Sequence, residues 1–299
     1  MWRSLTNRLR GPRPSGSRPV PTHINRTSRD LRVTCFVFEQ LSLEAFVAQM
    51  DLFRAETAAF GEILQLYRVK RSFPDLSNFR LGPNMFDKIL LDWILLVDDS
   101  KGEERSRLLA HGVATRIRWS GDVADLPSGW QGAVRQSYLD NIVNGATCNS
   151  LVGLFINVEP PFREGGLAAD VVGTMKTIRR EQRLAHFIIP LRLPQHYTRE
   201  NAALPIAQFS AMRRTDGLPL DHWLRLHVRL GAQIAATSET SHQHAMSTRD
   251  FFGQFGARFE TSGYHLVEKN GEWFRAYLDV ERDFALVNQG CVWVQYPPN

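Results

Sequence analysis

The sequence contains few cysteines and no long hydrophobic run. Its three cysteines, Cys35, Cys148 and Cys291, are scattered and form no C-x-x-C pair, which argues against a disulfide framework and a zinc site. His242 and His244 lie close together but have no carboxylate or cysteine in register, so we predict no metal. No apolar run approaches the roughly 18 residues of a membrane-spanning helix. We therefore expect reduced, mostly buried thiols in an intracellular protein that does not interact with membranes.

Positive charge is concentrated at the N-terminus and is scarce elsewhere. The 299-residue chain has a formal net charge of +5, but residues 1–32 hold eight arginines and a single acid, Asp30. That segment carries +7, so the rest of the chain carries −2. A nucleic-acid-binding protein needs a basic patch on its folded domain, so we predict no nucleic-acid partner. Residues 1–30, rich in Pro, Ser and Arg, are expected to be a disordered tail.

The same N-terminal tail is compatible with two cellular locations. A segment rich in arginine and free of acids before Asp30 is typical of a mitochondrial presequence. Its prolines argue against a continuous amphipathic helix beyond about residue 10, and it lacks the apolar region of a secretory signal. We expect a cytoplasmic protein, with a mitochondrial location as the alternative.

Short apolar runs and amphipathic segments alternate through the middle of the chain. Buried strands are predicted where apolar runs occur, at residues 32–38, 90–99, 107–119, 150–158, 185–192, 232–239, 273–281 and 291–296. Helices are predicted where apolar residues recur at helical spacing, at residues 42–67, 126–142, 166–183 and 221–230. Ser42 and Asp221 can cap two of these helices. The alternation predicts an α/β protein with a mixed sheet.

The junction "NVEPPFREGGLAADVV" after the strand at 150–158 has the composition of an anion site. Two prolines stop the strand, and the pattern Arg163-x-x-Gly166-x-Ala168 then opens a helix. The first N–H groups of a helix have no partner inside it, and the helix dipole adds positive charge there. Phosphate is the usual ligand of such an end, and Arg163 can add a charged hydrogen bond. The alternative is a plain strand–turn–helix, since the pattern is short and is neither a Rossmann fingerprint nor a P-loop.

This junction resembles the acyl-CoA signature of the GNAT acetyltransferase superfamily. In that superfamily a strand ends in V-x-P, matched here by Val158-x-Pro160, and R/Q-x-x-G-x-G/A follows, matched by Arg163-x-x-Gly166-x-Ala168. The stretch "HVRLGA", from His227 to Ala232, is similar to a later motif of the superfamily that ends Y-x-x-L-G-F. The resemblance covers roughly residues 31–250.

The resemblance implies a GNAT-like fold, with a mixed, mostly antiparallel sheet flanked by helices. We accordingly expect a disordered basic tail at 1–30, an acyl-CoA-binding core at 31–250, and a β-rich extension at 251–299 packed on the core. Acyl-CoA, most simply acetyl-CoA, is implied as the co-substrate. The residues implied to bind it are Val158, Arg163, Glu164, Gly165, Gly166, Leu167 and Ala168.

The resemblance also implies catalytic roles for three residues. The N–H of Val158, or one near it, would polarise the thioester carbonyl as an oxyanion donor. Many members donate a proton from a tyrosine four residues before the glycine of the later motif, and His227 occupies that place here. A histidine there could titrate near neutrality, or it could be a satisfied core residue. Glu159 is a candidate base toward the acceptor, with an exposed turn carboxylate as its alternative.

The leading functional prediction is an acyl-CoA-dependent N-acyltransferase in which a small-molecule amine attacks the thioester directly. Two alternatives remain: a GNAT-like domain that loads an acyl group onto a carrier or decarboxylates it, and an acyl-CoA-binding module without catalysis. The N-acyltransferase and the loading or decarboxylating domain both release free CoA, whereas the acyl-CoA-binding module does not. The sequence leaves a homodimer open and names no acceptor.

Overall fold

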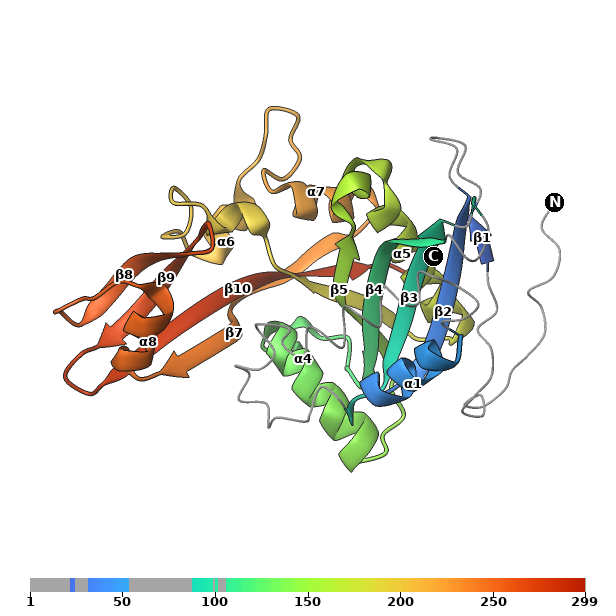
Figure 1. Cartoon of the computed structure of the whole chain (residues 1–299), viewed down its shortest axis with the longest axis horizontal. Helices are drawn as coiled ribbons and strands as arrows, with labels where there is room; N and C mark the ends of the chain where they lie inside the picture. Colours follow the sequence, from blue (N-terminus) through green and yellow to red (C-terminus); the bar gives the residue numbers. More distant parts are fainter. Residues whose placement is uncertain (1–21, 25–31, 54–87, 99, 102–105, 299) are drawn as a thin grey trace.

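The protein is built on one ten-stranded sheet, shown in Figure 1. The structure, a computed structural model, describes residues 22–24, 32–53, 88–98, 100–101 and 106–298. Thr22–Ile24 forms strand β1 and pairs with β2, so the prediction of a disordered tail is wrong for this short segment. The rest of the tail and residues 54–67 of the first predicted helix lie outside the described residues.

The strands follow the order β1-β2-β3-β4-β5-β6-β10-β9-β8, and β7 pairs with β10 off this path. The bounds are β1 Thr22–Ile24, β2 Val33–Leu41, β3 Leu91–Asp98, β4 Arg107–Ile117, β5 Ser150–Val158, β6 His186–Leu191, β7 Gln233–Met246, β8 Gly263–Lys269, β9 Glu272–Asp279 and β10 Phe284–Tyr296. Every neighbouring pair is antiparallel except β5–β6. The predicted mixed, mostly antiparallel sheet is confirmed.

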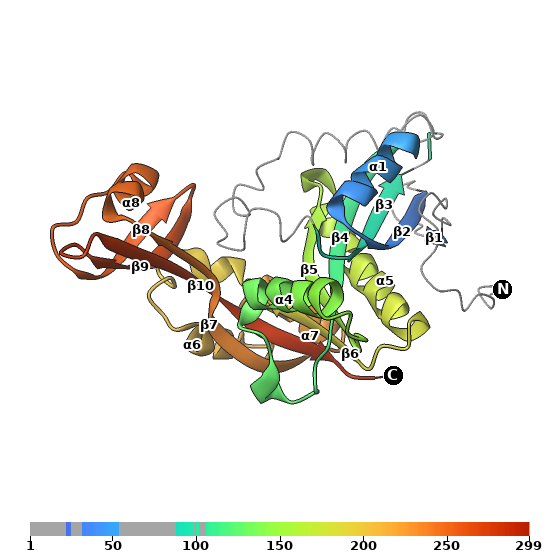
Figure 2. The same ribbon diagram turned by 90° about the horizontal axis from the view of Figure 1, so that it is seen from below.

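Helices cover both faces of the sheet (Figures 1 and 2). The α-helices are α1 Leu43–Phe53, α4 Gly129–Tyr138, α5 Leu167–Glu181, α6 Ile206–Ala211, α7 His222–Arg229 and α8 Thr248–Phe255. Shorter turns of other helix types occur at Val123–Asp125, Leu139–Val143, Pro160–Gly165 and Pro194–Tyr197. The predicted caps are confirmed: Ser42 accepts the N–H of Ala45, and Asp221 accepts those of Trp223 and Leu224. No helix of the described residues is long and apolar enough to cross a membrane.

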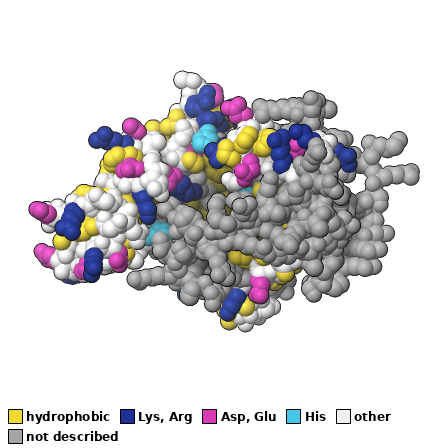
Figure 3. All heavy atoms as spheres, viewed as in Figure 1, with side chains coloured by type: hydrophobic (Ala, Val, Ile, Leu, Met, Phe, Trp, Pro, Cys, Tyr) yellow, Lys and Arg dark blue, Asp and Glu magenta, His cyan; other side chains and the backbone are white. Residues whose placement is uncertain are grey.

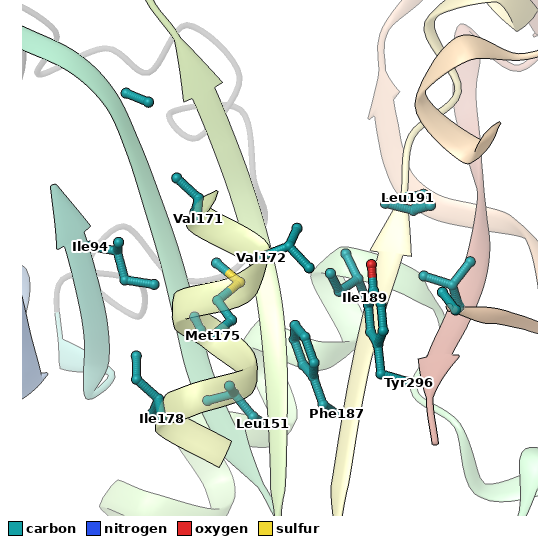
Figure 4. Close-up of a cluster of buried hydrophobic side chains, with 14 of the residues drawn as sticks. Ile94, Leu151, Val171, Val172, Met175, Ile178, Phe187, Ile189, Leu191 and Tyr296 are labelled. Carbon is teal, nitrogen blue, oxygen red and sulfur yellow. The ribbon is translucent and has the colours of Figure 1, made fainter. Parts of the chain in front are cut away.

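Two cores separate the helices into layers. On one face, called the α4 face below, α1 and α4 pack against the sheet around Trp93, Trp130 and Trp293. On the other, the α5 face, α5, α6 and α7 pack around Met175, Phe187 and other apolar residues. Figure 4 shows part of this second core, where α5 lies over β5 and β6. Alternate residues of each strand point to opposite faces, so both cores come from the same apolar runs.

The C-terminal part of the chain is divided between the sheet and a projecting arm. The arm consists of β8, β9, α8 and the far ends of β7 and β10, and it has its own small core around Phe251 and Phe274 (Figure 1). Charged side chains of both signs are interspersed over it (Figure 3). The C-terminal end of β10, from residue 292 onward, lies between β6 and β7 inside the sheet. Residues 251–299 are therefore not an extension outside the core, because their last strand completes it.

A glycine lets α5 approach the sheet. A Cβ added at Gly112 of β4 would lie 2.3 Å from Cγ1 of Val171 and 3.2 Å from Cε of Met175. We expect Gly112→Ala to destabilise the protein by about 1–3 kcal/mol, because overpacking forces backbone or rotamer shifts. Urea unfolding measures this. Gly173→Ala, on helix α5 itself, is the control. The added Cβ would meet nothing within 4 Å, and alanine favours a helix. Equal stability of the parent and Gly112→Ala would contradict the close packing.

Candidate active site

Strands β5 and β6 run parallel but pair only at their beginnings. The paired residues are 150–152 of β5 and 186–188 of β6. Beyond that point β5 stays with β4 as far as Val158, while β6 stays with β10 as far as Leu191. Figure 4 shows the two strands diverging, with Val172 of α5 pointing toward the opening. The sheet thus opens between β5 and β6 toward the end of β5, from which the chain leads into α5.

The backbone of β5 faces this opening at alternate residues. Glu159 donates its N–H to the carbonyl of Leu109 over 2.9 Å, and these residues lie opposite each other when the β4–β5 register is extended by one. Residues in an antiparallel ladder alternate between hydrogen-bonded and non-hydrogen-bonded pairs. The backbone groups of Ile156 and Val158 therefore point away from β4, toward the opening.

The chain turns at the mouth of the opening and enters α5 through a left-handed glycine. Pro160–Gly165 forms a 3-10 turn, and Gly166 follows with φ of 74° at the N-cap of α5. That conformation favours glycine. The N–H groups of Leu167 and Ala168 begin the helix, where no earlier helical carbonyl can accept them. The geometry expected for an anion-binding helix start is present at these residues.

Arg163 lies at this turn in an unexpected orientation. Its side chain is exposed, and its Nε donates to the carbonyl of Val158 over 3.3 Å. The guanidinium thus ties the turn to the last residue of β5, and its remaining N–H groups are the ones that could reach an anion. Glu164 is exposed and Gly165 half-buried. The structure brings the predicted CoA-binding residues together in space, and their ligand contacts stay a prediction.

Polar side chains lie on the α4 face of β4 and β5 near the end of β5. Phe155 of β5 packs on this face. Asn157 and Glu159 follow at every second position along the strand and its continuation, so their side chains lie on the same face. Asn157 donates to Oε1 of Glu159 over 3.2 Å. His111 of β4 is the register partner of Asn157, is 7% exposed, and contacts Phe155 edge-on at 5.5 Å. Sequence reasoning missed Asn157 and His111, although a polar residue inside each apolar run was a usable signal.

His227 lies on α7, on the other face of the sheet. Its side chain is fully buried, and Nδ1 lies 2.6 Å from the hydroxyl of Tyr296. Trp223 contacts the ring edge-on at 5.0 Å. Desolvation by burial, with the charge of Lys176 as a smaller cause, lowers the pKa of His227 to about 3. Burial of the ring favours the alternative of a core histidine, and a catalytic role for His227 stays a prediction.

The structure does not bring the two proposed proton carriers together. Glu159 follows the α4 face of β5, whereas His227 packs with Tyr296 and Trp223 on the α5 face. A single proton relay that uses both residues is not built here. The charged group beside His227 is Lys176, whose Nζ donates to Leu230 O over 2.7 Å and lies 4.4 Å from the centre of the Tyr296 ring.

The cysteines are unsuited to covalent catalysis. Cys35 and Cys291 are buried and Cys148 is half-buried, and all three are free thiols. Burial raises the pKa of Cys35 and Cys148 to about 11 and that of Cys291 to about 12. Thiols with such pKa values carry almost no thiolate at neutral pH. Within the described residues, no group of three or more His, Cys, Asp or Glu side chains could hold a metal ion.

Comparison with known proteins gives one curated relative of clear similarity. The chain is 29% identical over 191 residues to the arginine N-acetyltransferase avaD of Aspergillus versicolor. The match covers 58% of this chain and 65% of that relative, so it spans less than two thirds of the relative's length. No protein-family model matches the chain.

Two solved structures align with most of the chain at low identity. The loading GNATL domain of CurA from Lyngbya majuscula aligns with 88% of this chain and 97% of its own at 13% identity and a TM-score of 0.43. The GphF GNAT-like decarboxylase in complex with isobutyryl-CoA aligns with 87% and 98% at 13% identity and a TM-score of 0.41. This chain is thus similar in sequence to an N-acetyltransferase, and it resembles the GNAT superfamily in its diverging strands and in the glycine turn that begins α5.

Proposed function

We propose that this protein transfers an acyl group, acetyl in the simplest case, from CoA to the amine of a small molecule. The observation that carries the proposal is the backbone of β5. Ile156 and Val158 direct N–H groups into an opening that leads to the start of α5. These N–H groups and the N–H groups that begin α5 would serve as the oxyanion donor and the anion site that an acyl-CoA needs.

The phosphates would bind at the first N–H groups of α5. Leu167 and Ala168 supply these groups, and Gly166 lets the backbone approach the ligand without a side chain in the way. Arg163 can add a charged hydrogen bond without leaving Val158, because a guanidinium carries five N–H donors. The rest of the cofactor would lie between β5 and β6, where the strands no longer pair.

The acyl transfer itself is a direct displacement. The amine nitrogen attacks the thioester carbon, the C–N bond forms, and the negative charge that develops on oxygen is stabilised by an N–H of β5. The C–S bond then breaks, and the CoA thiolate leaves and takes up a proton. The amine must lose one proton, and Glu159 is the proposed acceptor of it because it ends the α4 face of the strand.

The acceptor proposed first is a basic amino acid such as arginine. The support is the similarity to an arginine N-acetyltransferase, together with the carboxylate of Glu159 and the amide of Asn157 beside it. Mass spectrometry of products formed from acetyl-CoA and a panel of amino acids tests this. Acetylated amine together with free CoA supports the proposal. Release of CoA without an acylated amine would favour loading or decarboxylation, and binding without release would favour a silent module.

Glu159→Gln should reduce kcat/KM for the amine by roughly 10²-fold, because the amide cannot take up a proton. The loss should shrink as pH rises and more of the amine is already neutral. Stopped assays of CoA release across pH measure both effects.

Glu181→Gln is the matched control, since Glu181 is an exposed glutamate at the C-terminal end of α5, away from the proposed CoA-binding residues. It should leave the rate unchanged. A Glu159→Gln variant as active as the parent at every pH would remove the carboxylate from the mechanism.

A further inference from the structure

Strand β5 contains a bulge just before it faces the opening. The β4–β5 register shifts between Val113 and Ala114, whose partners are Phe155 and Gly153, so Leu154 is the extra residue. The side chains of Leu154 and Phe155 both lie on the α4 face, as two adjacent residues do at a bulge. An extra residue is left outside the ladder, so its carbonyl needs another partner.

That partner is the indole of Trp130. Its Nε1 donates to the carbonyl of Leu154 over 2.8 Å, and the contact is buried. Trp130 is 8% exposed and belongs to the first turn of α4. A neutral donor thus occupies the one position where β5 departs from regular pairing.

The bulge decides which N–H groups of β5 face the opening. Inserting one residue reverses the direction of every later backbone group in a strand. Without the extra residue, Ile156 and Val158 would turn their N–H groups to β4, and those of Phe155 and Asn157 would face the opening instead. The position of the bulge therefore selects which residues of β5 supply the proposed oxyanion donor.

Trp130 is itself held from the far side of the opening. Its backbone N–H donates to Oγ of Ser241 on β7 over 2.9 Å, and its ring stacks on His242 at 5.2 Å with 21° between the planes. The preceding Gly129 has φ of 69°, and a Cβ there would lie 2.4 Å from Ser241 Cα. Helix α4 also contacts β4, β7 and β10, so it bridges the two halves of the divided sheet.

We propose that Trp130 is a positioning residue that locks the bulge of β5 and so fixes the N–H groups that activate the thioester. The proposal deepens the function proposed above and rests on it. The indole acts through the carbonyl of Leu154 and touches no reacting atom. Trp130 connects the two strands physically, because it bonds to Ser241 of β7 and to Leu154 of β5.

Trp130→Phe tests this, because phenylalanine keeps an aromatic ring and removes the donor. We expect kcat to fall roughly tenfold, since the Leu154 carbonyl loses its partner. KM for acyl-CoA should change less than about twofold, because the glycine turn that begins α5, where the phosphates are proposed to bind, is untouched. Hydrogen exchange of the peptide 150–158 should become faster in the variant.

Trp119→Phe is the matched control. Trp119 is 2% exposed, and its Nε1 donates over the same 2.8 Å to a backbone carbonyl, but that carbonyl belongs to Asp122 and not to β5. This variant should lose comparable stability and keep the kcat and the β5 exchange rates of the parent. Equal losses of kcat in both variants, or an unchanged kcat and exchange in Trp130→Phe, would overturn the proposal. If the parent acylates no amine, the proposed function fails, and the exchange of 150–158 still decides whether Trp130 locks the bulge.

Discussion

Substituting Gly166 with aspartate is expected to weaken CoA binding by roughly 10³-fold and to leave the fold intact. The added carboxylate would stand at the N-cap of α5, beside the N–H groups of Leu167 and Ala168 that are proposed to hold the phosphates. Juxtaposed like charges cost several kcal/mol, and about 4 kcal/mol corresponds to that factor. Titration calorimetry with CoA measures the loss, and circular dichroism checks the fold.

Two controls separate charge from shape. Gly166→Asn adds a side chain of the same size without charge, and asparagine tolerates the left-handed conformation that Gly166 has at φ of 74°. Gly173→Asp adds the same charge to an exposed position further along α5, where nothing lies within 4 Å of the new Cβ. Both should bind CoA far better than Gly166→Asp. Tight binding by Gly166→Asp would place the phosphates elsewhere.

The strands of the central sheet could be predicted from the sequence because each is a short, continuous apolar run. β3 and β6 are buried along nearly their whole length, and such runs need no knowledge of their neighbours. β8 was not predicted, because it lies in the arm and has one buried residue, Val267. Helix α6 is only six residues long, too short to show a helical period.

The glycine turn that begins α5 was also predictable, because a glycine pattern after a strand is local information. The bulge at Leu154 was not, since a register shift depends on which strand lies opposite and on the donor from Trp130. The same limit applies to His227. Its spacing to Gly231 suggested an acid, but only packing against Tyr296 and Trp223 shows that the ring is buried, which lowers its pKa.

Burial of His227 predicts that the protein loses stability in mild acid. The pKa of this ring is about 3 in the folded state and about 6.5 when unfolded, so the unfolded chain binds more protons between those values. The free energy of unfolding therefore falls as pH drops below about 6.5, by up to about 1.4 kcal/mol per pH unit from this residue. His227→Phe fills the site with a ring that does not titrate, and its stability should depend less on pH. Urea unfolding of parent and variant from pH 8 to pH 4.5 measures the difference in slope.

The comparison isolates His227 because the other groups that titrate are shared. His242, whose pKa burial also lowers to about 3, remains in both proteins and contributes equally to both slopes. His222→Phe, at an exposed position that begins the same helix, should keep the parent's slope. The expected result for His227→Phe is a flatter pH profile of stability with a rate per folded molecule close to that of the parent. Parallel stability curves together with a rate reduced by roughly 10²–10⁴-fold would instead show a ring that ionises in the folded protein and carries the proton in catalysis. A buried neutral ring changes the pH dependence of the free energy of unfolding, whereas a proton carrier changes the rate per folded molecule. Measuring both quantities on one preparation therefore assigns His227 to one role.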